Sequence, residues 1–512
     1  MSLTKHIVFS AFPAWGHTRP FCILAARLVK EHENVVVTML IAPNFLDKAH
    51  REISAELQSE HFEVARQRIR VLSTIHSDSD NLFQLLGPLA ETYASTYQTL
   101  VQEKSITCAM RSTVFDPVPV PTVVILDFFA LPQARATREI TGNSVPVMAW
   151  ITGHASSIIR LFGPESLGGL GDLGAKIDAE AARLRVTPEE IGDKIFTRTD
   201  GKVVKIRGLP PMYDYEFFPQ KAVFEGSVSS ILRGCYSFLQ ECDGALVSSL
   251  YAFEQESLEE FKSWFSSWNK SVYVIGPLLP LGLGVTSPSS RGADDIDKFL
   301  EKMLAGRGEK SVLFMSFGTA FFPAVPEYLE EVIEAFIDKD IPFIFCFASP
   351  YAKLSDGLVE KVELSGLGML IKWAPQQFIL SHPATGWFLS HGGHNGVMES
   401  LACGVPFILW PFEADQPGAA AHLSENLNVA IELIEVRSGE HGLKPLYRNG
   451  RTARGTREAV GIEIREVLDT CRSHKGEQMR TNARGMKQRF AEAWDNDGLS
   501  RKELRAFLDE YV

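Results

Sequence analysis

The first half of the chain alternates short apolar runs with stretches in which apolar residues recur every three or four positions. The run from His6 to Phe12 precedes a turn-rich loop, after which helical spacing is seen for Phe21, Leu24, Ala25, Leu28 and Val29. Further apolar runs, rich in β-branched residues, follow at Val35 to Ile41, Ile69 to Leu72, Thr122 to Leu126 and Val145 to Trp150. Strands that alternate with helices in this way predict a parallel sheet with helices on both faces.

The same alternation returns in the second half of the chain. Apolar runs are found at Val312 to Phe317, Phe343 to Phe347, Met369 to Lys372, Gly386 to Ser390 and Phe407 to Pro411, with helices expected at Pro326 to Ile337 and near Asn395 to Cys403. This pattern predicts a second doubly wound half. Open α/β sheets bind ligands beyond the carboxyl ends of their strands, so we expect the site in the cleft between the two halves.

Two stretches interrupt the alternation. Between Ile151 and Pro219, glycine-rich and charged segments predict an irregular excursion beside a pocket. The segment Gly276 to Gly292 is rich in Pro, Gly and Ser, which is typical of an exposed connection between domains. We therefore expect a first domain at residues 1–276, a linker at 277–293 and a second domain at 294–494. Residues 495–512 are predicted to form an amphipathic helix whose apolar face carries Leu504, Phe507, Leu508 and Tyr511.

Composition narrows the class of protein. The 512 residues are 45% hydrophobic and 22% charged, as in ordinary globular proteins of two or three domains. The formal net charge of -12 disfavours a nucleic-acid binder, so an anionic ligand must be held locally. The seven cysteines show no CxxC pair and no metal-ligand spacing, which predicts reduced thiols in the cytoplasm. No apolar run approaches ~18 residues, so we expect no signal peptide and no transmembrane segment.

The segment from Trp373 to Gln416 combines several groups that suit a nucleotide ligand. Its run Ser390-His391-Gly392-Gly393-His394-Asn395-Gly396 follows an apolar strand and opens an amphipathic helix. Backbone N–H groups and the helix dipole at such a position attract an anion, and glycines let the backbone approach it. His391 can donate to a phosphate oxygen. The alternative is a simple tight turn.

Three further features of this segment have both a binding and a structural interpretation. Glu399 lies about one turn into the helix, where a carboxylate can accept from a ribose diol, or it is a solvated helix carboxylate. Trp373 can stack on uracil, or it is a core aromatic. Asp415 and Gln416 can bind sugar hydroxyls, or they form a helix N-cap pair.

The whole segment resembles, without a gap, the signature box of the family-one UDP-glycosyltransferases. The resemblance implies a GT-B fold, in which two Rossmann-like domains face each other across a cleft. It further implies that the first domain binds the acceptor, that the second binds the UDP-sugar, and that the C-terminal helix returns to the first domain. The UDP-sugar contacts carried over by position are Thr152, Ser316, Thr319, Trp373, Ala374, Gln376, His391, Gly393, His394, Asn395, Gly396, Glu399, Asp415 and Gln416.

The chain departs from the plant pattern of this box at three positions. Gly392, His394 and Gly396 stand where plant members typically carry Cys, Trp and Ser. Because that Trp contributes to the sugar end of the plant site, His394 leaves the identity of the sugar open. Gln416 resembles the corresponding residue of glucose users.

The loop from Phe12 to Pro20 resembles the PxxGHxxP loop of the same family, in which the histidine is the catalytic base. This implies that His17 is the base, and the ordinary imidazole pKa of ~6.5 allows a neutral, proton-accepting form at cellular pH. Asp127 ends an apolar strand where the family has the partner aspartate, which would hold the imidazole tautomer. The alternative for Asp127 is a helix N-cap.

Aromatic residues near the predicted base indicate an apolar acceptor pocket, which we expect to include Phe12, Trp15, Phe128, Phe129 and Phe162. The predicted enzyme is a monomer that transfers a sugar, with inversion, from a UDP-sugar to a small lipophilic phenol or alcohol such as a flavonoid. No DxD-type metal site accompanies the box, so neither metal nor cofactor is expected. The alternatives are a sterol glucosyltransferase, a nucleotide-sugar epimerase or phosphorylase of related architecture, and a non-catalytic binding protein.

Overall fold

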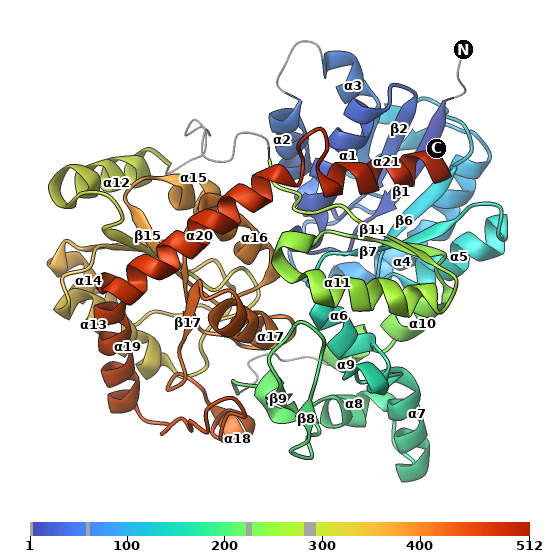
Figure 1. The fold of residues 1–512 in the computed structure, drawn as a ribbon. Coiled ribbons are helices and arrows are strands. Elements are labelled where there is room, and N and C mark those ends of the chain that lie inside the picture. Colours follow the sequence, from blue (N-terminus) through green and yellow to red (C-terminus); the bar gives the residue numbers. More distant parts are fainter. Residues whose placement is uncertain (1–3, 58–61, 222–227, 281–292) are drawn as a thin grey trace.

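The computed structural model describes residues 4–57, 62–221, 228–280 and 293–512, which form two parallel sheets covered by helices (Figure 1). The strands of the first sheet are β1 Lys5–Ser10, β2 Val35–Leu40, β3 Ile69–Leu72, β6 Val123–Asp127, β7 Val147–Ile151, β10 Gly244–Val247 and β11 Ser271–Val274. They lie in the order β11-β10-β7-β6-β1-β2-β3, and all neighbours are parallel.

The second sheet has six parallel strands. They are β12 Val312–Ser316, β13 Phe343–Cys346, β14 Gly368–Ile371, β15 Thr385–Ser390, β16 Phe407–Leu409 and β17 Ala430–Glu432. Their order is β14-β13-β12-β15-β16-β17. The prediction of two doubly wound halves from the alternating apolar runs is therefore confirmed.

Helices cover both sheets. Those of the first half include α1 Trp15–Glu31, α2 Leu46–Glu56, α3 Glu63–Gln67, α4 Leu82–Val101, α5 Leu131–Thr141, α10 Cys235–Glu241 and α11 Tyr251–Ser266. Those of the second half include α12 Ala293–Arg307, α13 Pro326–Asp338, α14 Asp356–Ser365, α15 Gln376–Ser381, α16 His394–Cys403, α17 Gln416–Ala421 and α19 Arg457–Arg472. Because helices lie on both faces, central strands such as β6 are buried at every position, and this explains their unbroken apolar runs.

In each sheet, the order in which the chain adds strands reverses once, and these two reversals locate the site. From β1 the chain proceeds outward to β2 and β3, whereas β6 starts on the other side of β1. In the second sheet the same reversal separates β12 from β15. At such switch points the loops after two adjacent strands diverge and leave a crevice. The loops after β1 and β6, and those after β12 and β15, carry most of the predicted site residues.

The stretch between Ile151 and Pro219 is more regular than predicted. It contains α6 Ala155–Phe162, α7 Leu173–Leu184, α8 Pro188–Phe196 and an antiparallel pair of short strands, β8 Val203–Val204 and β9 Met212–Tyr213. A capping box formed by Thr187 and Glu190 starts α8, and this local signal is present in the sequence. Figure 1 shows these elements below the first sheet, beside the second half. The Tyr215 hydroxyl donates to the carbonyl oxygen of Pro445 at 2.7 Å, and this hydrogen bond joins the stretch to the second half.

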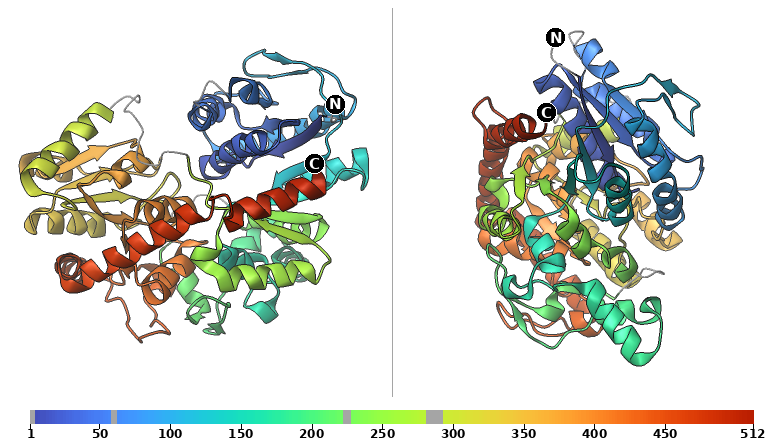
Figure 2. Two further views of the ribbon diagram at one scale, coloured as in Figure 1. Left: turned by 45° about the horizontal axis from the view of Figure 1, so that its top comes forward. Right: turned by 90° about the vertical axis from the view of Figure 1, so that its right-hand side faces the viewer.

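The C-terminal segment crosses from the second half back to the first. Helix α20 His474–Glu492 runs along the second half, and α21 Leu499–Tyr511 lies against β11 (Figure 2). The helix starts at Leu499, four residues later than expected. Three of its four predicted apolar residues are buried, and the Phe507 ring lies 5.5 Å from that of Tyr273. Residues 281–292 of the predicted linker lie outside the described residues, so the domain boundaries stay a prediction.

Among the helices that the structure describes, none combines the length and apolar character needed to cross a membrane.

The packing of α21 predicts a measurable loss of stability when its central aromatic side chain is removed. Phe507 is fully buried, so Phe507→Ala leaves a cavity and should lower the free energy of unfolding by ~3–5 kcal/mol in urea titrations. Asp509 lies on the exposed side of the same helix, and Asp509→Ala should change this free energy by at most about 0.5 kcal/mol. Equal effects of the two substitutions would show that α21 is not anchored as described.

Candidate active site

His17 and Asp127 meet at the switch point of the first sheet. Because α1 begins at Trp15, His17 lies in the first turn of this helix instead of in the preceding loop. Its Nδ1 lies 2.7 Å from Oδ2 of Asp127 and 2.9 Å from the hydroxyl of Thr152. Asp127 is fully buried at the end of β6. Since α5 begins four residues later and has Ala130 at its N-cap, the alternative of an N-cap aspartate is wrong.

The geometry assigns the protonation of His17. A carboxylate only accepts, so the proton shared with Asp127 is carried by Nδ1, and in the neutral ring the lone pair is therefore on Nε2. The side chain of His17 is 22% exposed, while that of Asp127 is 1% exposed. The rings of Phe12, Phe128 and Phe129 lie 5.1, 6.1 and 5.6 Å from the imidazole. His17 is thus a partly accessible proton acceptor in apolar surroundings.

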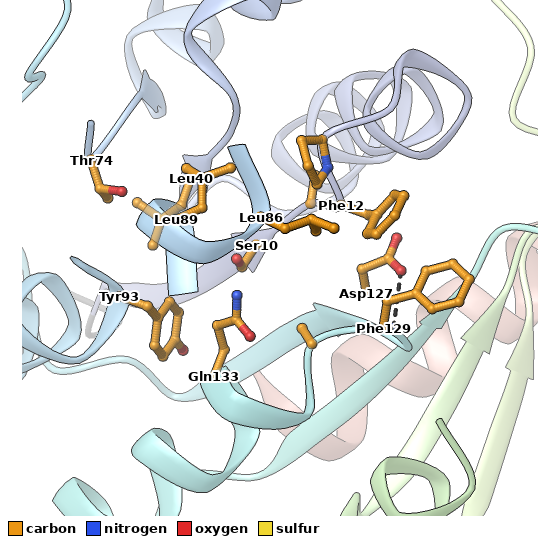
Figure 3. A pocket seen from close by; sticks show the side chains of 13 residues that line it. Ser10, Phe12, Leu40, Thr74, Leu86, Leu89, Tyr93, Asp127, Phe129 and Gln133 are labelled. Atoms are coloured by element: carbon orange, nitrogen blue, oxygen red, sulfur yellow. Dashed lines mark hydrogen bonds between the residues drawn. The ribbon is translucent and has the colours of Figure 1, made fainter. Parts of the chain in front are cut away.

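A cavity of about 30 Å³ opens beside Asp127 (Figure 3). Of the five aromatic residues expected in an acceptor pocket, Phe12 and Phe129 line this cavity, while Trp15, Phe128 and Phe162 do not. Phe162 is almost fully buried and packs against Phe128, and Trp15 packs against Phe45. Other residues also line the cavity, although the sequence did not indicate them. They include the apolar Leu40, Leu86 and Leu89 and the polar Ser10, Thr74, Tyr93 and Gln133.

One polar atom in this lining has no partner. The amide oxygen of Gln133 is buried and accepts no hydrogen bond from the described residues. Figure 3 shows Gln133 and Tyr93 on the side of the cavity away from Phe12 and Phe129. The cavity therefore offers an apolar wall together with one free acceptor.

The Gly-rich run of the second half lies at the other switch point. Ser316 and Ser390 end β12 and β15 and stand side by side in register. Gly392 has φ +86°, and a Cβ on Gly393 would come within 2.6 Å of the His391 ring, so both positions require glycine. Helix α16 begins at His394, and within the described residues no group accepts from the N–H of Asn395 or Gly396. Free donors at a helix N-terminus are the groups that the predicted anion site requires.

His391 stands beside these donors. Burial lowers the pKa of its imidazole to about 4, so the ring is neutral at physiological pH. A neutral imidazole still carries one N–H, which is what the predicted contact with a phosphate oxygen needs.

Glu399 is buried, so the alternative of a solvated helix carboxylate is wrong. Its Oε2 accepts from Nε2 of Gln376 at 2.5 Å, and its Oε1 accepts from Nε2 of Gln377 at 3.1 Å. Oε1 also forms an ion pair with Arg19, which belongs to α1 in the first half. Arg19 binds Glu52 of α2 as well, at 3.0 Å. The sequence did not single out Arg19, although it lies two residues after His17.

Asp415 and Gln416 begin the segment around α17. Asp415 occupies the N-cap position of this helix but does not cap it with its side chain. Its Oδ2 instead accepts from the N–H of His394 at 2.9 Å, and burial raises its pKa to about 6. The amide oxygen of Gln416 accepts from the N–H of Phe412 at 2.9 Å. The predicted N-cap role is therefore absent for the Asp415 side chain.

Three predicted residues lie at the surface of the second half. Trp373 is 51% exposed, which excludes the alternative of a core aromatic. Ala374 follows it with intermediate exposure, and Thr319 is exposed in the turn after β12. Within the described part of the chain the side chains of Thr319 and Trp373 make no hydrogen bond, so the structure does not join them to the other site residues.

The first turns of α16 and α1 are in direct contact across the two halves. The side-chain amide of Asn395 donates to the carbonyl oxygen of Gly16 at 2.8 Å. His394 lies between Ser248 and His154 of the first half, with contacts of 3.1 and 3.0 Å. The predicted base and the predicted anion site thus face each other. A larger cavity of about 1010 Å³, beside α11 and the segment from Arg489 to Ser500, contains none of the predicted site residues.

The chain is similar to characterised glycosyltransferases along its full length. Residues 189–440 match the family model described as UDP-glucoronosyl and UDP-glucosyl transferase. The chain is 31% identical to UDP-glycosyltransferase eriJ of Hericium erinaceus, with 98% of each chain covered. It is 25% identical to UDP-glucose flavonoid 3-O-glucosyltransferase 6 of Fragaria ananassa, over 100% of this chain and 99% of the relative.

Solved structures share the fold. UGT71G1 of Medicago truncatula, complexed with UDP-glucose, matches with a TM-score of 0.69 and 19% identity, and 99% of this chain and 98% of that chain are covered. UGT2 of Phytolacca americana, complexed with UDP-2fluoro-glucose and pterostilbene, matches with a TM-score of 0.65 and 19% identity. The match covers 99% of this chain and 100% of that chain. The predicted GT-B fold is thereby confirmed.

The burial of His394 predicts a specific dependence of stability on pH. Its pKa is lowered from the ordinary 6.5 to about 3 by burial, so between pH 6.5 and 4 the unfolded chain takes up a proton at this position and the folded chain does not. Stability is therefore lost as the pH falls, by on the order of 2 kcal/mol from this residue. In urea titrations at pH 7 and pH 4.5, His394→Gln should lose less stability than the wild type. Equal losses would contradict the buried, neutral state.

Proposed function

The chain belongs to the family-one UDP-glycosyltransferases, and we propose that it transfers glucose from UDP-glucose, with inversion, to a hydroxyl of a small lipophilic acceptor such as a phenol or flavonoid. That it is an enzyme which transfers a sugar from a UDP-sugar to a small acceptor follows from the family. The observation that carries the finer proposal is the His17–Asp127 pair, 2.7 Å apart, in which Asp127 lines the cavity and His17 lies in the helix turn that contacts the first turn of α16.

The second half supplies the groups that would hold the donor. The free N–H groups of Asn395 and Gly396, together with neutral His391, would bind the diphosphate. Such fixed donors stabilise the negative charge that develops on the leaving UDP. Glu399 would accept from the ribose diol, and the exposed indole of Trp373 would stack on uracil.

The first half supplies the base. Nε2 of His17 removes the proton of the acceptor hydroxyl while the oxygen forms a bond to the anomeric carbon. The bond from that carbon to the phosphate oxygen breaks on the opposite face, and its electron pair leaves with UDP. Asp127 holds the Nδ1 proton and stabilises the imidazolium that forms. One displacement of this kind inverts the anomeric centre.

The cavity supports an apolar acceptor that carries a hydroxyl group. Phe12, Phe129 and the leucines of the lining offer apolar contact, and the unpartnered amide oxygen of Gln133 can accept one hydrogen bond from the acceptor. The cavity is far below the ~300–1,000 Å³ of pockets that hold drug-sized ligands, so lining side chains must move when an acceptor binds. An aromatic acceptor is also supported by two similar proteins: one is named as a flavonoid glucosyltransferase, and the other was solved with pterostilbene.

Replacing the base tests the mechanism. His17→Ala should lower kcat about 10²–10⁴-fold in assays with UDP-glucose and a panel of phenols, read by mass spectrometry, and should leave the Kd for UDP unchanged. Asp127→Asn should lower kcat as well, because the correct tautomer is no longer held. Transfer at the wild-type rate by His17→Ala would refute the assignment of the base. Conversion of UDP-glucose to another UDP-sugar without an acceptor would identify an epimerase instead.

The ion pair between Arg19 and Glu399 predicts an effect on donor binding. Arg19 shares the carboxylate that the ribose diol would use, so the two compete for Oε1. We expect Arg19→Ala to bind UDP about fivefold more tightly, in line with the ~1 kcal/mol of one hydrogen bond.

The control for this experiment is 2′,3′-dideoxy-UDP, which has no diol. Isothermal titration calorimetry should give the same Kd for this analogue with the wild type and with Arg19→Ala. Weaker binding of UDP by the variant would mean that Arg19 orients Glu399 and does not compete with the ribose.

A further inference from the structure

The walls of the cavity beside Asp127 differ in how firmly they are held. The ends of β1 and β6 form one wall, and Asp127 in it is fixed by its hydrogen bond to His17. Another wall is the amino-terminal half of α4, from which Leu86 and Leu89 project toward the cavity (Figure 3). The cavity of about 30 Å³ must enlarge before the proposed acceptor can enter, so we expect the wall that is held least to move.

Pro88 interrupts the hydrogen bonding of α4. It lies inside the helix, beyond the first turn, where an ordinary residue would donate its N–H to the carbonyl oxygen of Gln84. Proline has no N–H, and its ring crowds the same carbonyl group, so a proline in a helix interior weakens or kinks the helix. The helix is therefore weakened between residues 82–87 and the remainder.

Gly87 adds to this weakness, because glycine in a helix interior is less favourable than alanine. Neither packing nor backbone conformation requires a glycine at this position. A Cβ there would meet no atom within 4 Å, and the φ of the residue is not positive. Gly87 and Pro88 are both exposed, and neither lines the cavity. The two residue types that least favour a helix thus stand next to each other on the outer side of α4.

The part of α4 after the proline is firmly anchored to α5. The hydroxyl of Tyr93 lies 2.8 Å from that of Thr137, and the hydroxyl of Tyr97 lies 3.1 Å from that of Thr141. Both tyrosine side chains are buried, and their rings stack with centroids 5.8 Å apart. These contacts hold the carboxyl-terminal part of the helix in place.

The part of α4 before the proline has little to hold it. Within residues 82–87, all of which the structure describes, Leu85 alone is buried, and Phe83 is 45% exposed. The side chain of Gln84 accepts from the hydroxyl of Ser79, in the preceding loop, at 2.7 Å. Opening of this part would expose mainly Leu85, and the cost of exposing it keeps the segment closed when no acceptor is bound.

We propose that residues 82–87 form a lid over the cavity, and that this lid turns about Gly87 and Pro88 to admit the acceptor. The two hinge residues then determine how readily an acceptor binds, although neither touches it. The proposal rests on the function proposed above, because it takes the cavity beside Asp127 as the acceptor site. Only the open form takes up the acceptor, so the apparent affinity is reduced by the fraction of molecules that are open.

Stiffening the hinge tests the lid. Alanine stabilises the closed helix, so KM for a phenol that the wild type glucosylates should rise about fivefold in Gly87→Ala and at least about tenfold in Pro88→Ala. Both kcat and KM for UDP-glucose should stay within about twofold, because neither residue touches the donor or the reacting groups. Pro88→Gly restores the N–H without the stiffness, so its KM should lie between those of the wild type and Pro88→Ala. An unchanged acceptor KM in both alanine variants, or a lower kcat at unchanged KM, would overturn the proposal.

The same chemical changes in other helices serve as controls. Gly485 is also exposed inside a helix, α20, and a Cβ there would meet no atom within 4 Å. Pro326 is the first residue of α13, where the helix needs no N–H donor. Gly485→Ala and Pro326→Ala should therefore keep the acceptor KM of the wild type. An equal rise of KM in these two variants would refute the hinge, because the effect would not depend on the place of the substitution.

A nitroxide spin label gives a measurement that does not depend on turnover. Gln84 and Ser95 are both exposed, one in each part of α4. The labels are attached to Gln84→Cys and Ser95→Cys in a Cys403→Ser background, since the other six cysteines are buried. Acceptor added together with UDP should increase the mobility of the label at position 84 and leave that at position 95 unchanged, and Pro88→Ala should reduce the increase. Equal changes at both positions, or none at either, would contradict the lid.

The outcomes also separate the lid from the proposed function. If the wild type transfers glucose to a phenol but its acceptor KM does not respond to the hinge substitutions, only the lid is refuted. If the folded wild type neither binds UDP nor transfers glucose to any phenol of the panel, the function itself is refuted.

Discussion

The first turn of α16 is held against the first turn of α1 by the amide of Asn395, which donates to the carbonyl oxygen of Gly16. This contact joins the switch points of two separate sheets. On one side it fixes the helix turn that carries His17, and on the other the turn with the free N–H groups of Asn395 and Gly396. A base and an anion site in different domains can act on one substrate only if such contacts set their distance. The crossing C-terminal helices and the contacts of His394 with Ser248 and His154 hold the same arrangement.

Much of this arrangement was readable in the sequence, because it depends on local chemistry. Buried parallel strands produce unbroken apolar runs, and the strand-loop-helix transition at Ser390 to Gly396 is marked by glycines that the backbone needs, such as Gly392 with its positive φ. The same reasoning failed where only a weak local signal was present. The glycine-rich and charged pattern after Ile151 predicts an irregular segment, although the Thr187–Glu190 capping box marks the start of a helix there.

Other features could not be predicted, because they exist only in the folded chain. Arg19 pairs with Glu399, which lies 380 residues later in the sequence, and no pattern in either segment predicts this pair. The cavity beside Asp127 combines residues from β1, α4 and α5, whereas Trp15, Phe128 and Phe162, which we expected in an acceptor pocket because they are close to His17 and Asp127 in sequence or type, do not line it.

The central claim is that a single displacement occurs between the base of the first half and the diphosphate site of the second. The stereochemistry of the product tests it most directly. The glucose of UDP-glucose is α-linked, so proton NMR of the glycoside formed by the wild-type enzyme should show only the β-anomer, with its large coupling between the protons on C1 and C2. An α-glycoside as the initial product would contradict the account, because it requires either a second displacement or attack from the face that UDP leaves.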